Sequence, residues 1–289
     1  MKQHNPLITL TTDFGLADGY VGTMKGIILG IAPDARLVDI THQIAAQDVR
    51  QAAFVLYSAY PFFPPHTVHL VVVDPGVGSA RRPVALRTPA GTFVGPDNGV
   101  FTYVLAHEPV EALVELADPR YRLSEVSRTF HGRDVFAPAA AHLAAGVLFA
   151  ALGPSISDPV TFPLPRLEIG SGAVAGEVLL ADRFGNVVTS VGRLVWDGAE
   201  LVLEPAFQDA GGRKQDARRA APTRFRANEA VVVVAGQEIV GVRHTYAEAE
   251  PGEALALVSS EGHLEIAVRE GSAAQRLGLR PGDAVEVRL

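Results

Sequence analysis

The sequence predicts an α/β protein: an N-terminal domain with a mostly parallel, Rossmann-like sheet, followed by a smaller C-terminal antiparallel β-barrel domain. Three observations support this fold class. Up to about residue 160, short apolar strands alternate with amphipathic helices, which is the pattern of parallel βαβ units. Residues 153–166 contain four prolines and are typical of a stiff linker. Beyond them, glycine-containing turns separate short strands, as in small antiparallel barrels.

The length of 289 residues and the apolar content of 48% are sufficient for two domains with separate cores. We therefore expect an N-terminal α/β domain over residues 1–160 and a C-terminal barrel domain over residues 167–289. The proline-rich stretch between them would be extended.

In the first domain, strands and helices are expected to alternate before a hairpin and an alanine-rich helix. The first helix has Val21, Met24 and Ile28 at helical spacing, and Asp48 is placed to cap the second. The expected elements are strand Leu7–Thr11, helix Tyr20–Ile31, strand Leu37–Ile40, helix Val49–Tyr60, strand Val68–Val73, hairpin strands Val84–Arg87 and Thr92–Val94, and a helix over Asp134–Leu152.

In the second domain, we expect a series of short strands and one long loop. The loop, Gln208–Ala221, is polar and charged and should be exposed. The expected strands are Glu177–Ala181, Val187–Val191, Ala230–Ala235, Glu238–Val242, Leu255–Ser259, Leu264–Val268 and Ala284–Arg288.

Composition excludes several classes of function. The chain has no cysteine, which removes disulfides, thiolate catalysis and Cys-ligated metal sites. The formal net charge of −7 argues against nucleic acid as a partner, because a nucleic-acid-binding face is basic. No apolar run approaches 18 residues and the first residues lack a signal-peptide core. We therefore expect a cytoplasmic protein with no membrane partner. Dinucleotide-binding, P-loop, zincin and nucleophile-elbow motifs are also absent.

The stretch VVVDPGVGSARR, Val71–Arg82, delivers an acid to a glycine-rich loop. Three β-branched residues lead into Asp74, and Arg81 follows in the same loop. This is the pattern of a buried strand with a carboxylate at its C-terminal end, where open α/β sheets bind their ligands. An aspartate can also cap a turn, so the residues alone leave a functional and a structural interpretation open.

Two further acids follow the first strand. Asp13 ends that strand, and Asp18 stands at the start of the first helix. A carboxylate in this place can accept hydrogen bonds from both hydroxyls of a ribose, as in nucleotide-binding folds. Turn formation by Asp13 and helix capping by Asp18 are the structural alternatives.

His131 lies between Phe130 and Gly132 at an expected helix entrance. Gly132 would allow close approach of a ligand, and amides at a helix entrance can hold an anion. A single histidine is more often structural. We expect Arg133 and Asp134 to pair with each other or to cap the helix.

Asp182, Phe184 and Asn186 lie in the segment ADRFGN between two expected strands. An acid, an aromatic ring and an amide together could hold an adenine or an amino-acid group. Composition alone favours a hairpin turn.

Six motifs, in order along the chain, resemble those of the S-adenosyl-L-methionine (SAM) hydroxide adenosyltransferases. They are TTDFGLADGYVGTMKG, DITHQI, VVVDPGVGSARR, GPDNGVF, TFHGRDVFAPAAA and ADRFGN. These SAM hydrolases are related to the fluorinases and chlorinases. The resemblance extends over nearly the whole chain, including its ending GHLEIAVREGSAAQRLGLRPGDAVEV. It implies metal-independent hydrolysis at C5′ of SAM to adenosine and L-methionine, with SAM as the substrate and no cofactor. It also implies a homotrimer with active sites between subunits.

Residue by residue, the resemblance implies catalytic and substrate-binding roles. The catalytic Asp–Arg–His set falls on Asp74, Arg81 and His131. The implied substrate-binding residues are Asp13 and Asp18 at the ribose, Phe130 and Gly132 beside the catalytic histidine, Asp182, Phe184 and Asn186 at the amino-acid end, and Ser260 near the adenine. Glu261 stands where the halogenases often have an arginine, and Gln47 where they have an aromatic residue.

The implied reaction depends on activating water. The leaving group is a neutral thioether that departs from a sulfonium, so no general acid is required. Alignment of the water opposite the C–S bond can supply up to about 7–11 kcal/mol, and a proton acceptor contributes on the order of 10²–10⁴-fold. Either Asp74 or a neutral His131 could accept the proton, while Arg81 would stabilise hydroxide-like charge.

Three other functions stay open from the residues. A SAM-dependent halide adenosyltransferase would use the same pocket, but Asp74 places negative charge where the anion would bind. A non-catalytic SAM- or adenosine-binding protein would need only the ribose and adenine contacts. A purely structural α/β protein would leave three acid-bearing loops unexplained.

Overall fold

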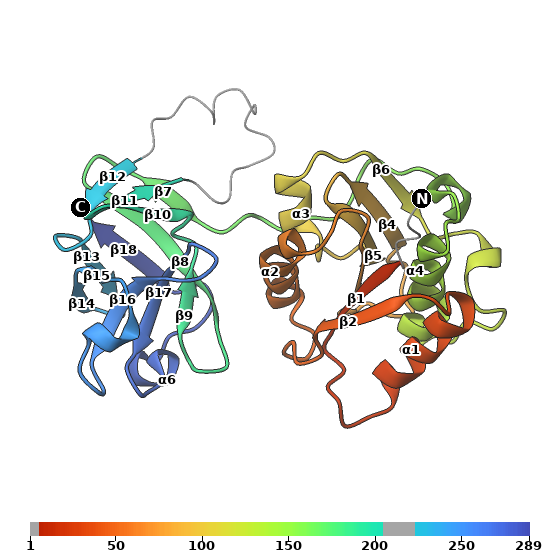
Figure 1. Cartoon of the computed structure of the whole chain (residues 1–289), viewed down its shortest axis with the longest axis horizontal. Coiled ribbons are helices and arrows are strands. Elements are labelled where there is room, and N and C mark those ends of the chain that lie inside the picture. The colour runs from red at the N-terminus through yellow and green to blue at the C-terminus, as the bar shows by residue number, and fades with distance from the viewer. Residues whose placement is uncertain (1–5, 205–222) are drawn as a thin grey trace. The chain divides into compact units, whose positions relative to one another are not determined.

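The computed structural model describes residues 6–204 and 223–289 (Figure 1). The chain divides into two compact units, Met1–Phe162 and Pro163–Leu289, and each is described by itself. The expected loop Gln208–Ala221 lies outside the described residues.

The first unit contains a six-stranded sheet with the order β2-β1-β3-β5-β4-β6. Its strands are β1 (Leu7–Thr12), β2 (Arg36–Thr41), β3 (Val68–Val72), β4 (Pro83–Thr88), β5 (Gly91–Pro96) and β6 (Ala112–Glu115). The first four strands in the order are parallel, and β4 is antiparallel to both of its neighbours. The predicted mostly parallel sheet with an added hairpin is confirmed.

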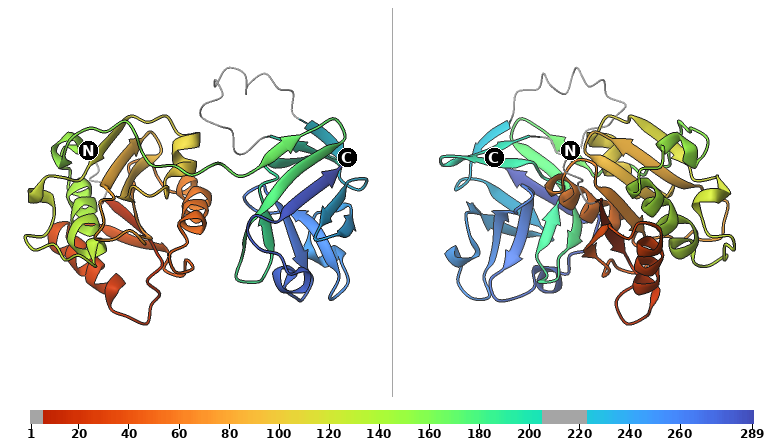
Figure 2. Two further views of the ribbon diagram at one scale, coloured as in Figure 1. Left: turned by 180° about the vertical axis from the view of Figure 1, so that it is seen from behind. Right: turned by 45° about the vertical axis from the view of Figure 1, so that its right-hand side comes forward.

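Helices cover both faces of this sheet (Figures 1 and 2). α1 (Tyr20–Ile31) and α4 (Ala137–Ala144) share one buried apolar cluster with the sheet. α2 (Val49–Ala59) and α3 (Thr102–His107) share a second cluster on the opposite face. The first unit is therefore a three-layer α/β/α structure.

β3 contributes to both layers because successive residues of a strand point to opposite faces. Leu70 and Val72 lie in the cluster with α1 and α4, whereas Val71 and Val73 lie in the cluster with α2 and α3. This double burial explains the continuous apolar run that leads into Asp74.

The alanine-rich segment is not the single helix expected over Asp134–Leu152. It begins with a π-helical turn, Gly132–Phe136, continues as α4, and ends in the 3₁₀ turn Phe149–Leu152. Pro138 has no N–H with which to bond the carbonyl of residue 134. The N–H of Ala137 bonds instead to the carbonyl five residues back, which gives the π-helical geometry.

Most other elements of the first unit match their predicted ranges to within one or two residues. The Asp48 carboxylate accepts the N–H of Gln51 at 2.9 Å, which confirms the predicted cap of α2. α3, β6 and the 3₁₀ turns Tyr60–Phe62 and Pro119–Tyr121 were not predicted.

The second unit is built around a nine-stranded sheet with the order β14-β13-β18-β8-β9-β17-β16-β15, and β7 pairs with β8. These strands are β7 (Leu167–Ile169), β8 (Ala173–Ala181), β9 (Val187–Thr189), β13 (Val231–Val234), β14 (Gln237–Val240), β15 (Val242–Arg243), β16 (Ala254–Val258), β17 (Leu264–Val268) and β18 (Ala284–Arg288). Only Gly241 separates β14 from β15, so the two ends of the order adjoin and the barrel is nearly closed.

The predicted C-terminal barrel is confirmed, with local differences. β15 pairs with β16 in parallel, whereas an antiparallel barrel was expected. β7 was not predicted, and the expected strand Glu238–Val242 is divided into β14 and β15 at Gly241. A further three-stranded sheet, β10 (Leu194–Asp197), β11 (Glu200–Leu203) and β12 (Thr223–Arg226), was not predicted. The short helix α6 (Ala273–Leu277) precedes β18.

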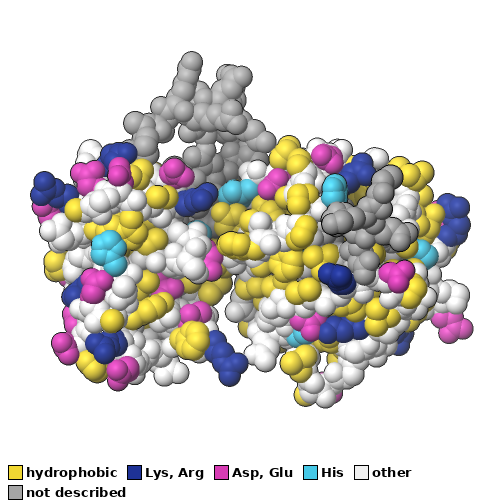
Figure 3. All heavy atoms as spheres, viewed as in Figure 1, with side chains coloured by type: hydrophobic (Ala, Val, Ile, Leu, Met, Phe, Trp, Pro, Cys, Tyr) yellow, Lys and Arg dark blue, Asp and Glu magenta, His cyan; other side chains and the backbone are white. Residues whose placement is uncertain are grey.

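On the face shown in Figure 3, acidic and basic side chains are interspersed over the described parts of both units. Among residues 6–204 and 223–289, no helix has the length and hydropathy needed to span a membrane.

Candidate active site

The order in which the chain adds strands to the first-unit sheet reverses between β1 and β3. The chain leaves β1 through α1 to β2 on one side, and then passes through α2 to β3 on the other side. At such a point the loops after the two strands diverge and open a crevice in which ligands bind. Asp13 directly follows β1, and Asp74 lies two residues beyond β3. Both predicted acids therefore lie at this edge of the sheet.

Asp74, Arg81 and His131 form one hydrogen-bonded cluster. The Arg81 guanidinium donates from Nε to Oδ1 of Asp74 at 2.8 Å and from Nη2 to Oδ2. The same Nη2 lies 2.9 Å from Nδ1 of His131. The side chains of Asp74 and Arg81 are only 5% and 9% exposed. The structure thus places all three predicted catalytic residues in contact, two of them shielded from water.

The contact with Arg81 determines the tautomer of His131. A guanidinium only donates hydrogen bonds, so Nδ1 is the acceptor and the neutral ring carries its proton on Nε2. Burial lowers the pKa of His131, and the charge of Arg81 lowers it further, while Asp74 and Asp134 act in the opposite direction. The ring is therefore neutral at pH 7.

Arg81 retains one buried donor. Its Nη1 is buried and has no hydrogen-bond partner in the described part of the chain. The guanidinium carbon lies 5.0 Å from the centre of the Phe136 ring. An unpaired buried donor costs free energy, and a cationic N–H beside a carboxylate is suited to a small oxygen ligand such as water.

Asp13 joins two loops at the same edge. Its Oδ2 accepts the N–H of Gln47 at 2.8 Å, and Gln47 has a left-handed backbone with φ of 67°. Asp18 is exposed, and the capping position of α1 belongs to Gly19, without a side-chain bond. Helix capping therefore does not explain Asp18.

Phe130 belongs to an aromatic cluster at the start of α1. Its ring centre lies 5.8 Å from that of Phe14 and 5.1 Å from that of Tyr20, both at steep interplanar angles. Sequence reasoning missed Phe14 and Tyr20. Both lie within the motif that contains Asp13 and Asp18, and that proximity was the available signal.

Gly132 has a packing role in addition to the predicted one, which stays a prediction. A Cβ at this position would lie 3.2 Å from Sδ of Met24 and 3.3 Å from atoms of Phe130 and Val72. The close approach that glycine permits is thus to the protein itself. It holds the turn that carries His131 against α1 and β3.

The loop around Asp74 is braced by the turn after β5. Asn98 donates from Nδ2 to the carbonyl of Val73 at 2.9 Å. Arg82 pairs with the buried Asp97 at 2.7 Å and with Asp158 at 2.8 Å. Arg82 is therefore structural, although it follows Arg81 directly.

Arg133 and Asp134 pair with each other at 2.5 Å, which confirms the structural interpretation of these two residues.

In the second unit, Asp182, Phe184 and Asn186 lie in the β8–β9 hairpin. Oδ1 of Asp182 accepts the N–H groups of Phe184 at 2.8 Å and Asn186 at 2.9 Å. The preferred hairpin interpretation is thus confirmed. Phe184 is 77% exposed, so the turn presents an aromatic ring to solvent. Ser260 lies elsewhere in this unit and donates to Glu261 at 2.8 Å.

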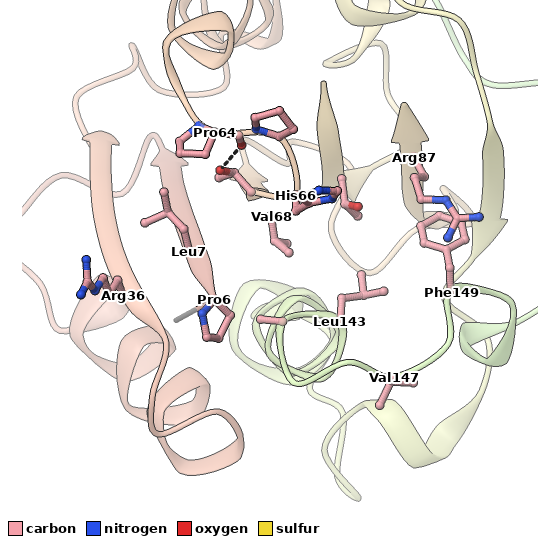
Figure 4. A pocket seen from close by; sticks show the side chains of 14 residues that line it. Pro6, Leu7, Arg36, Pro64, His66, Val68, Arg87, Leu143, Val147 and Phe149 are labelled. Carbon is pink, nitrogen blue, oxygen red and sulfur yellow. Dashed lines mark hydrogen bonds between the residues drawn. The ribbon is translucent and has the colours of Figure 1, made fainter. Parts of the chain in front are cut away.

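A cavity of about 850 Å³ lies at the opposite edge of the first-unit sheet. Figure 4 shows Leu7 and Val68, at the starts of β1 and β3, lining it together with Leu143 of α4. None of the predicted site residues lines this cavity. In the described part of the chain, no group of three or more acidic or histidine side chains is arranged to hold a metal.

The fold and this edge of the sheet define an α/β protein with a candidate site at a topological switch point, joined in the chain to a β-barrel unit. Residues 8–153 match the SAM hydroxide adenosyltransferase N-terminal domain, and residues 176–286 match the C-terminal domain of the same family. The chain belongs to the SAM hydroxide adenosyltransferase family.

Two curated relatives are named (R)-S-adenosyl-L-methionine hydrolase. The protein from Salinispora tropica is 40% identical over 285 residues, covering 98% of this chain and 97% of its own. The protein from Thermus thermophilus is also 40% identical, covering 96% and 97%. A fluorinase from an Actinoplanes species is 30% identical over 252 residues, covering 72% and 85%.

The solved structures agree with this assignment of the fold. An uncharacterized conserved protein from Thermotoga maritima has a TM-score of 0.82 at 34% identity and covers 98% of this chain and 100% of its own. A conserved hypothetical protein from Thermus thermophilus has a TM-score of 0.73 at 37% identity, covering 98% and 99%.

Proposed function

We propose that the protein hydrolyses SAM at C5′ to adenosine and L-methionine. The observation that carries this proposal is the shielded Asp74–Arg81–His131 cluster, with an unpaired Nη1 of Arg81, at the switch point of the sheet. Membership of the family, and relatives named SAM hydrolase, support the choice of substrate and reaction.

In this proposal, water donates a hydrogen bond to Asp74 beside the Arg81 guanidinium and attacks C5′ on the side opposite sulfur. A C5′–O bond forms as the C5′–S bond breaks, and the electron pair of the broken bond neutralises the sulfonium. Methionine therefore leaves as a neutral thioether without an acid. Holding the water in line can supply several kcal/mol, up to about 7–11.

We assign the proton of the attacking water to Asp74. Nδ1 of His131 already accepts a hydrogen bond from Arg81, and Nε2 of the neutral ring already carries a proton. Each Asp74 oxygen accepts from Arg81 and has a second lone pair for the water. His131 then holds the Arg81 guanidinium in position by accepting a hydrogen bond from its Nη2.

Substrate binding is proposed to draw on both units. Asp13 and Asp18 accept hydrogen bonds from the ribose hydroxyls, and Gly132 fixes His131 beside Phe130. The residues proposed for the amino-acid and adenine ends are Asp182, Phe184, Asn186 and Ser260.

We also propose a homotrimer in which residues of one subunit's first unit and a neighbour's second unit complete each active site. Resemblance to the family supports this assembly. A cytoplasmic location stays a prediction from the sequence.

Incubation of the purified protein with SAM in ¹⁸O-labelled water tests the reaction. We expect adenosine labelled at its 5′-oxygen and unlabelled methionine. Release of S-adenosylhomocysteine, or of unlabelled adenosine, would contradict the mechanism. Addition of fluoride or chloride distinguishes a halide transferase, and we expect little halogenated nucleoside because Asp74 repels the anion.

A further inference from the structure

Glu265 is a buried acid that the proposed reaction does not use. It lies in β17 and is 5% exposed. Burial raises its pKa, and the negative charges of Asp182 and Glu261 act in the same direction, while a hydrogen bond from Tyr246 opposes them. No cation is among these influences. A buried carboxylate without a cation is costly, so its presence in the barrel calls for a specific contact.

That contact is Tyr246, whose hydroxyl donates to Oε1 of Glu265 at 2.6 Å. The Tyr246 ring is 44% exposed, but the turn that carries it is fixed. Thr245 and Glu248 form a capping box around it, and Arg269 donates to the carbonyl of Ala249 at 2.6 Å. An exposed ring is thus held over a buried acceptor by a rigid turn.

The same hydroxyl reaches Asn186 in the β8–β9 hairpin. Nδ2 of Asn186 lies 3.2 Å from Oδ2 of Asp182 and 3.5 Å from the hydroxyl oxygen of Tyr246. Because a carboxylate only accepts hydrogen bonds, the amide nitrogen must face Asp182. Both hydrogens of that nitrogen are then directed at protein atoms. The amide oxygen, Oδ1, remains the acceptor for a ligand.

We propose that Glu265 is a positioning residue: through Tyr246 it holds the amide of Asn186 so that Oδ1 accepts a hydrogen bond from an amino group of the substrate. Glu265 accepts the hydrogen bond from the Tyr246 hydroxyl, so the lone pairs of that hydroxyl oxygen face Nδ2 of Asn186. This inference rests on the proposed function, because it assumes that Asn186 contacts SAM.

SAM offers two amino groups that can donate to an amide oxygen, the ammonium of its methionyl part and the 6-amino group of adenine. Loss of one hydrogen bond to such a group weakens binding by about 10-fold. The contact is remote from C5′ and exists before the reaction, so its loss affects KM more than kcat.

Steady-state kinetics with SAM test the proposal. We expect Tyr246→Phe and Glu265→Leu each to raise KM by about 10-fold with kcat within twofold of wild type. The double variant should be no worse than the more affected single variant, because both act through one chain of bonds. Glu265→Gln keeps an acceptor oxygen for the Tyr246 hydroxyl and should restore KM to within about twofold. Glu286→Leu, at a half-buried acid of β18, is the matched control.

Calorimetric titration with adenosine and with L-methionine identifies the amino group. Tyr246→Phe should weaken binding of only one of these two products, and that product carries the group. If wild type consumes SAM while Tyr246→Phe and Glu265→Leu leave KM unchanged, the positioning role is overturned. If wild type does not consume SAM, the proposed function fails. The two titrations then still decide whether Tyr246 orients Asn186, and unchanged binding of both compounds would reject it. Should Glu265→Leu fail to fold, Tyr246→Phe at its half-exposed ring carries the test.

Discussion

A single guanidinium, that of Arg81, connects the acid and the imidazole of the candidate site. Its Nε and Nη2 donate hydrogen bonds to Asp74, and Nη2 also donates to His131. Nη1 has no partner among the described residues. Lysine could not reproduce this pattern, because its ammonium has no planar fork.

Replacing Asp74 tests the proton acceptor. Asp74→Asn keeps the shape of the side chain but removes its charge and basicity, so we expect kcat to fall on the order of 10²–10⁴-fold. Calorimetric binding of SAM should change only a few-fold. Asp158→Asn, at a partner of the structural Arg82, is the control and should keep wild-type kcat. Wild-type turnover by Asp74→Asn would exclude this residue from the mechanism.

The pH dependence of kcat/KM tests the neutral state of His131. Burial and Arg81 lower the pKa of this ring below its ordinary value of 6.5. Above that pKa, Nδ1 accepts from Arg81; below it, Nδ1 carries a proton and the contact is lost. We therefore expect kcat/KM to be level at neutral pH and to fall on the acidic side of pH 6.5.

His131→Gln, which retains an acceptor oxygen but does not titrate, should lack this acidic limb. An acidic limb with an apparent pKa above 6.5 in the wild type would contradict the assignment.

The sequence was informative about residues whose role follows from their place in a motif. Asp74 and Arg81 come from one motif and His131 from another, and the three side chains lie in contact, as their proposed shared role requires. The motif pointed to Phe14 and Tyr20 by proximity alone, and their contact with Phe130 could not be predicted because it depends on the path of the loop between β1 and α1. The packing of Gly132 against Met24 and Val72 could not be predicted, because only the coordinates show what lies beside it.

At the scale of elements, periodicity predicted α1 and the strands that precede Asp74. It failed where local chemistry interrupts a favourable composition, as Gly146, with φ of 91°, does after α4 in the alanine-rich segment. The three-stranded sheet of β10, β11 and β12 was missed. Its strands are four residues long, and so short a run carries little periodic signal.

Removing the cap of α2 tests one predicted element boundary. Asp48→Ala deletes the acceptor of the Gln51 N–H, so we expect the free energy of unfolding to fall by about 1 kcal/mol and Tm by about 2–4 °C. Asp48→Asn keeps a capping oxygen and should remain close to wild type. Calorimetric melting measures both, and equal Tm values for all three proteins would mean that the cap contributes nothing.

At the scale of the whole molecule, the residues proposed for substrate are divided between two units. The first unit carries the Asp74–Arg81–His131 cluster, and the second carries the hairpin of Asp182 and Asn186. Sequence can assign such residues to units, but it cannot state which copies of the units meet in an assembly.

Mixing inactive variants tests the proposed trimer. Asp74→Asn disables the first unit, and Asp182→Ala disables the second. If sites form between subunits, trimers that contain both variants include some sites with two intact halves. Co-refolded mixtures should then regain a measurable fraction of wild-type turnover, and light scattering should show three subunits. Mixtures as inactive as either variant alone would place both halves of a site in one chain.

The contact of Met24 with Gly132 has a consequence for directed evolution of this enzyme. Met24 never meets the substrate in the proposed mechanism, yet its sulfur limits how close the His131 turn can come to α1. Libraries that vary positions 24 and 132 together would shift the His131 imidazole slightly without replacing Asp74, Arg81 or His131. Such a library offers a graded adjustment of turnover that substitutions among the reactive groups cannot give.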